Sequence, residues 1–164
     1  MSKARELANL RGTPTDSNIL LQSTAGDALT AGSGKCNIAM GINALGATTI
    51  GVCNIAIGVG AMYGVTTGQA DSNIAIGVSA LVGAAGTSGN ENIAIGRSSL
   101  IAMTTGSNNI GIGLTSGDAL TTGTDNVAIG RLALSASTDG ADNVAIGVSA
   151  LAESGNDADG GTLA

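Results

Sequence analysis

A five-residue segment in which bulky aliphatic residues alternate with small ones recurs along the chain. It begins with Asn, continues with Ile or Val at the second place, Ala or Gly at the third and Ile or Met at the fourth, and ends with Gly. Its copies begin at Asn37, Asn54, Asn73, Asn92, Asn109, Asn126 and Asn143, and a degenerate copy, NILLQ, begins at Asn18. Alternation with a period of two residues is typical of β-strands. The intervals are 17 or 19 residues, which differ by an even number, so each strand keeps its inward and outward faces.

A second short segment follows each copy, as in SALVGAA, and ends in Thr, Ser and Gly turn residues. A fixed period of this kind indicates that each unit buries its apolar side against its neighbours. We therefore predict an all-β parallel β-solenoid of about eight coils, each with about two short strands and two turns. The solenoid is expected at residues 17–152, between an N-terminal attachment arm (1–16) and a polar, flexible C-terminal tail (153–164).

The fourth place of each copy is predicted to fill the coil, because the chain has no Phe or Trp that could do so. Stacking would put these residues in one column, and we predict that they are the solenoid core: Ile57, Ile76, Ile95, Ile112, Ile129 and Ile146.

The leading Asn is present in all eight copies. Stacked at one corner, its amides can hydrogen-bond along the rod, so we predict a structural ladder of Asn18, Asn37, Asn54, Asn73, Asn92, Asn109, Asn126 and Asn143. A ligand or ion site is the alternative. The Gly that ends most copies either permits a bend or lets a neighbouring chain approach closely.

Composition and charge restrict the function. The chain of 164 residues has no His, which removes the commonest general base and metal ligand, so we expect no enzyme, no cofactor and no metal. A net charge of −6 with six Lys and Arg argues against nucleic acid as a partner, and no apolar run is long enough for membrane insertion.

Three other patterns leave alternatives open. Cys36 and Cys53 are 17 residues apart, one coil, so they form either a disulfide or a pair of reduced small residues. Acidic residues just before a repeat Asn are either solvated turn charges or a calcium ladder: Asp71, Glu91, Asp125 and Asp142. Thr pairs such as Thr104 and Thr105 are either turn residues or an ice-binding face.

The N-terminal segment carries half of the basic charge of the chain. We predict a short helix here, and an attachment arm that binds an acidic or apolar groove through Lys3, Arg5, Leu7, Leu10 and Arg11. A frayed terminus is the alternative.

The repeated N-x-A-I-G with its small-residue segment resembles the head repeats of trimeric autotransporter adhesins and the related arrays of bacteriophage fibre proteins. The resemblance covers residues 18–151, and the opening MSKARELANL is similar to the start of marine phage fibre proteins. It implies a left-handed parallel β-roll, three rolls about a three-fold axis, and an adhesive or structural role. The coil is longer than the short adhesin repeat, and no signal peptide, coiled-coil stalk or membrane anchor is expected from the sequence.

These departures favour a virion protein assembled in the host cytoplasm and displayed on the virion surface. Rows of Ala and Gly invite close sheet contact, which independently predicts an oligomer, and the resemblance implies that this oligomer is a homotrimer. We expect a short tail fibre or fibre segment, with a capsid decoration as the alternative and host-surface adhesion or ice binding as more remote ones. The expected partners are the chain itself, another virion protein bound by the arm and, in an adhesive role, a host-surface receptor.

Overall fold

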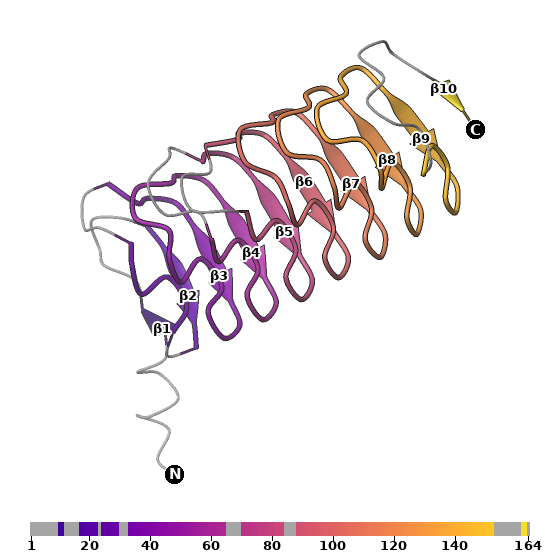
Figure 1. Cartoon of the computed structure of the whole chain (residues 1–164). Coiled ribbons are helices and arrows are strands. Elements are labelled where there is room, and N and C mark those ends of the chain that lie inside the picture. The colour runs from indigo at the N-terminus through magenta and orange to yellow at the C-terminus, as the bar shows by residue number, and fades with distance from the viewer. Residues whose placement is uncertain are drawn as a thin grey trace.

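The chain folds as an all-β parallel β-solenoid (Figure 1). The computed structural model describes residues 10–11, 17–22, 24–29, 33–64, 70–83, 88–152 and 162–163. One sheet contains ten strands in sequence order: β1 (Leu10–Arg11), β2 (Ile19–Leu21), β3 (Ile38–Met40), β4 (Ile55–Ile57), β5 (Ile74–Ile76), β6 (Ile93–Ile95), β7 (Ile110–Ile112), β8 (Val127–Ile129), β9 (Val144–Ile146) and β10 (Thr162–Leu163). Strands β2 to β9 are the second to fourth residues of the eight repeat copies, so the period-two pattern locates each of them.

The repeat copies are stacked in register. Ile74 pairs with Ile93 across a 19-residue coil, and Ile93 pairs with Ile110 across a 17-residue coil, both in parallel. The two extra residues therefore do not change the alignment of the strands.

The second segment of each unit is not a strand, which corrects the prediction of two strands per coil. Within the described residues each coil contains one strand of three residues, and the second segment is a series of turns. Leu81 and Leu100 have φ of 50° and 49°, values of the left-handed region that β-strands do not use. These turns still stack, because the Leu81 N–H donates to the Ser99 carbonyl and the Leu100 N–H to the Ser116 carbonyl, both at 2.9 Å.

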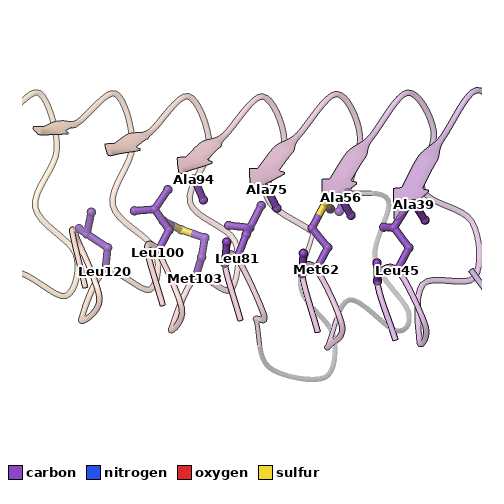
Figure 2. Packing of buried hydrophobic residues seen from close by; sticks show 14 of the residues in the cluster. Ala39, Leu45, Ala56, Met62, Ala75, Leu81, Ala94, Leu100, Met103 and Leu120 are labelled. Carbon is purple, nitrogen blue, oxygen red and sulfur yellow. The ribbon is translucent and has the colours of Figure 1, made fainter. Parts of the chain in front are cut away.

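The interior is filled from the opposite face of the strand to the one predicted, so the assignment of the fourth-place Ile residues to the core is wrong. The third place of the repeat is fully buried, as at Ala75 and Ala94, whereas Ile57, Ile76, Ile95, Ile112, Ile129 and Ile146 are only partly buried or are exposed. The physical reason is the width of the coil: Leu and Met from the turn segment project toward the strand and occupy the space, which leaves room for a small residue at the third place (Figure 2). In β2, where Gly26 replaces the turn leucine, Leu20 occupies this place.

The large interior side chains form one column along the turn segment, made up of Leu45, Met62, Leu81, Leu100 and Leu134. Where Gly117 interrupts this column, Leu120 from the next turn fills the coil, and a Cβ on Gly117 would lie 3.2 Å from Leu120 Cδ1. Gly111 replaces Ala in the strand column, where a Cβ would lie 2.6 Å from Ser99 Oγ and 2.8 Å from Leu100 Cγ. Both glycines are explained by the volume of neighbouring side chains.

Short strands cover both ends of the sheet. β1 pairs antiparallel with β2, and β10 pairs parallel with β9 at the other end of the rod (Figure 1). Leu10 and Arg11 of the expected arm therefore lie in a strand. The predicted helix and the other arm residues, Lys3, Arg5 and Leu7, lie outside the described residues, as does most of the expected tail. Among the described residues, none belongs to a helix of the length and apolarity that a membrane crossing requires.

Candidate interaction surfaces

The asparagine corner is a buried hydrogen-bond ladder. Asn92 Oδ1 accepts a hydrogen bond from the backbone N–H of Asn109 at 3.0 Å, and Asn92 Nδ2 donates to the Gly106 carbonyl at 2.9 Å. The first of these bonds recurs at every step from Asn18 to Asn143. The second recurs from Asn18 to Asn126. Each side chain thus holds the turn that precedes the next Asn.

This geometry explains why the position is Asn in every copy. The side chain must accept with one atom and donate with another, which Asp cannot do, and Gln would place both atoms one bond too far away. The residue before each Asn is left-handed, with φ of 58° at Glu91 and 59° at Asn108. The two hydrogen bonds of each ladder side chain hold the backbone on both sides of this left-handed residue, as Asn73 does at Gly89 and Asn92. Because the amides from Asn37 to Asn126 are buried and bonded within the chain, they are not available to a ligand.

The glycines that end the repeat copies, which we call the corner glycines, bend the chain and also permit close approach of a neighbouring backbone. Gly77 has φ of 135°, and a Cβ there would lie 2.7 Å from the carbonyl carbon of Gly96 in the next coil. The same relation holds from Gly41 to Gly130. The neighbour that comes close is therefore the next coil of the same chain, not another chain.

Two columns of aliphatic side chains face outward from the strands. One is formed by the second place of the repeat, such as Ile74 and Ile93, and the other by the fourth place, such as Ile76 and Ile95. Ile19, Met40, Ile76 and Ile146 are exposed by more than a third of their area. Together these columns form the outer sheet face, a continuous apolar strip along the rod. Such surfaces mark interaction sites on soluble proteins.

Cys36 and Cys53 lie on consecutive coils at the position before the ladder Asn. Both are exposed free thiols rather than core residues, and the Cys53 N–H donates to the Lys35 carbonyl at 2.9 Å. Desolvation raises the pKa of the Cys53 thiol, and the neighbouring Cys36 thiol raises it further.

The acidic and Thr patterns act in turns. Within the described ranges, no group of three or more Cys, Asp and Glu side chains could hold a metal ion. Thr104 and Thr121 donate their hydroxyls to the carbonyls of Thr121 and Thr138 in the next coil, at 3.0 and 2.8 Å. They are turn residues.

Asp118 is a polar residue that sequence analysis did not single out. Its Oδ1 atom is buried and has no hydrogen-bond partner. Desolvation raises the pKa of this carboxyl, against the lowering effect of the backbone N–H groups of Asp118 and Ala119.

A surface pocket of about 320 Å³ is a second feature that the sequence analysis missed. It is lined by Arg97, Ser98, Leu114, Thr115, Arg131 and Leu132. Both arginines follow a corner glycine, and this shared place in the repeat is the signal that could have connected them.

No family model, curated protein or solved structure matches the chain.

Proposed function

We propose that the protein is a non-enzymatic structural component of a virion, a homotrimer of left-handed β-solenoids that serves as a short tail fibre or fibre segment of a bacteriophage. The observation that carries the proposal is the outer sheet face. Aliphatic side chains cover it from β2 to β9, so burying this face against other copies is favoured by the hydrophobic effect. The resemblance of the repeats to trimeric adhesin heads and phage fibre arrays supports three copies.

The contact surface proposed here differs from the Ala and Gly rows that the sequence favours. Ala75 and Ala94 are inside the coil and cannot reach another chain, whereas Ile76 and Ile95 on the same strands face outward. Packing three outer sheet faces about one axis would remove the aliphatic columns from water. Each Å² of apolar surface buried in this way contributes about 25 cal/mol to the free energy of association. The inner face of each strand then stabilises the fold of one chain, and the outer face of the same strand forms the contact between chains.

Sedimentation equilibrium tests the assembly. We expect a mass of three chains of 15.6 kDa for the natural protein and dissociation toward single chains for Ile112→Lys, which puts a charge on the outer sheet face. Thr122→Lys is the matched control, since it adds the same charge on an exposed turn. A single-chain mass for the natural protein, or equal dissociation of the two variants, would contradict the trimer.

The virion role needs a separate test. Immunogold microscopy of purified particles should place the protein on the tail. Labelling of the capsid surface would instead select the decoration role, and absence from purified particles would overturn the virion assignment.

A further inference from the structure

The residue after each corner glycine defines a surface column, which we call the post-glycine column. It consists of Ile42, Val59, Val78, Arg97, Leu114, Arg131 and Val148. Its five aliphatic members are 36–65% exposed, and the two arginines are exposed as well. Aliphatic residues at this position are therefore compatible with the fold. The two arginines depart from the repeat, and the solenoid does not require them.

The two arginines lie on alternate coils with a leucine between them. The Thr115 N–H donates to the Arg97 carbonyl at 3.0 Å, and the Leu132 N–H donates to the Leu114 carbonyl at 3.1 Å, which puts the three residues on consecutive coils. At about 4.8 Å per coil the two arginine backbones are about 10 Å apart. Two long side chains with this separation can reach one ligand from both sides.

The charge of the pocket is unusual for this protein. The chain has a net charge of −6, and beyond residue 11 its cations are Lys35, Arg97 and Arg131 alone. Two of these three line the same pocket, and none of the lining residues is acidic. Like charges placed together repel each other unless an anion neutralises them, and guanidinium groups bind carboxylate and sulfate groups through paired hydrogen bonds.

The rest of the lining favours a sugar. Leu114 and Leu132 supply apolar surface, and Ser98 offers a hydroxyl to ring hydroxyls. The Thr115 hydroxyl donates to the Leu114 carbonyl at 2.8 Å and keeps its lone pairs to accept a hydrogen bond. A volume of about 320 Å³ is at the small end of the range for small-molecule sites. No aromatic residue lines the pocket, so nothing there offers the stacking platform on which proteins bind nucleobases.

We propose that Arg97 and Arg131 form a binding site for an acidic glycan, through sugar units that carry a carboxylate or a sulfate. The two guanidinium groups hold the acidic groups, and the leucines between and beside them contact the sugar rings. The site requires neither the virion role nor a particular oligomer.

Isothermal titration calorimetry of the full chain tests this proposal with three probes of matched length: oligogalacturonate, sulfated dextran and unmodified dextran. We expect binding of at least one acidic probe, weakening with added salt, and no binding of unmodified dextran. Carboxylate and sulfate ligands are told apart by which acidic probe binds more tightly. Sodium sulfate is titrated as a fourth sample.

The decisive variant is Arg97→Val combined with Arg131→Val, which restores the residue found at Val78 and Val148 and should therefore fold. We expect at least a tenfold loss of affinity for the acidic probe. Lys35→Gln removes an exposed cation outside the pocket and should leave the affinity within twofold. The proposal is overturned if neither acidic probe binds, if Lys35→Gln weakens binding as much as the double variant, or if sodium sulfate binds as tightly as the glycan.

Discussion

Adjacent residues of one strand have opposite roles in this protein. Ala94 is fully buried inside the coil, while Ile95, the next residue of β6, faces outward and is only partly covered. In most small domains the larger aliphatic residue would be inside. Here the coil is so narrow that Leu100 and Met103, which come from the turn side, fill it. Size alone therefore does not tell which face of a strand is internal, because the segment on the other side of the coil decides how much room remains.

The largest loss of stability short of unfolding is expected at the corner where the strand begins. Asn92→Asp replaces a donor by a carboxylate oxygen that faces the Gly106 carbonyl in a buried site. We expect a loss of about 3–5 kcal/mol in the free energy of unfolding, as for other unpaired buried charges. Denaturant titration measures it. Asn90→Asp, at a half-buried position two residues earlier, controls for the change of residue type, and equal losses at the two sites would show that the ladder is not special.

Enlarging the inner residue should have the next largest effect. Ala94→Leu puts three additional carbons into a filled coil, and we expect a loss of about 3 kcal/mol or more. The isomeric change Ile95→Leu on the outer face should cost less than about 1.5 kcal/mol. Urea midpoints of the two variants compare them, and an unchanged midpoint for Ala94→Leu would mean that the coil has room the structure does not show.

Truncating the outer residue should affect assembly more than fold. Ile95→Ala removes a half-buried side chain, so we expect about 1 kcal/mol or less from the isolated chain. In a trimer the same change also reduces the contact between copies, which makes the melting temperature more dependent on protein concentration. Calorimetry over a range of concentrations detects this. A loss of several kcal/mol that is independent of concentration would place Ile95 inside the coil.

The smallest expected effect concerns Asp118. Its pKa is raised by desolvation in the folded chain, so the protonated form favours folding, and stability falls as the pH rises through the folded pKa. Asp118→Asn should therefore stabilise the protein at neutral pH by less than about 1 kcal/mol, and this gain should vanish below the unfolded pKa of about 3.9. Thermal melts at several pH values measure it, with Asp139→Asn as the control for losing one exposed charge. A gain that persists at low pH would assign the effect to something other than ionisation.

The repeat made the strands and the ladder position predictable, because period-two alternation and an Asn in every copy are local signals. The inner face was not predictable from Ile57 or Ile95, since alternation distinguishes two faces without saying which is internal. The turns at Leu81 and Leu100 were also missed, because leucine seldom adopts a positive φ and only stacking against neighbouring coils stabilises it there. Arg97 and Arg131 are 34 residues apart, so their shared pocket required the coil register.

The central claim is that the Ala face of the strand is inside and the Ile face is outside. The thermal melts of Ala94→Lys and Ile95→Lys, two adjacent residues given the same charged side chain, test it most directly. We expect Ile95→Lys to retain a cooperative unfolding transition, because the lysine reaches water, and Ala94→Lys to have none, because a coil that excludes water cannot take up a charge. A cooperative transition for Ala94→Lys together with none for Ile95→Lys would show that the Ile face is inside.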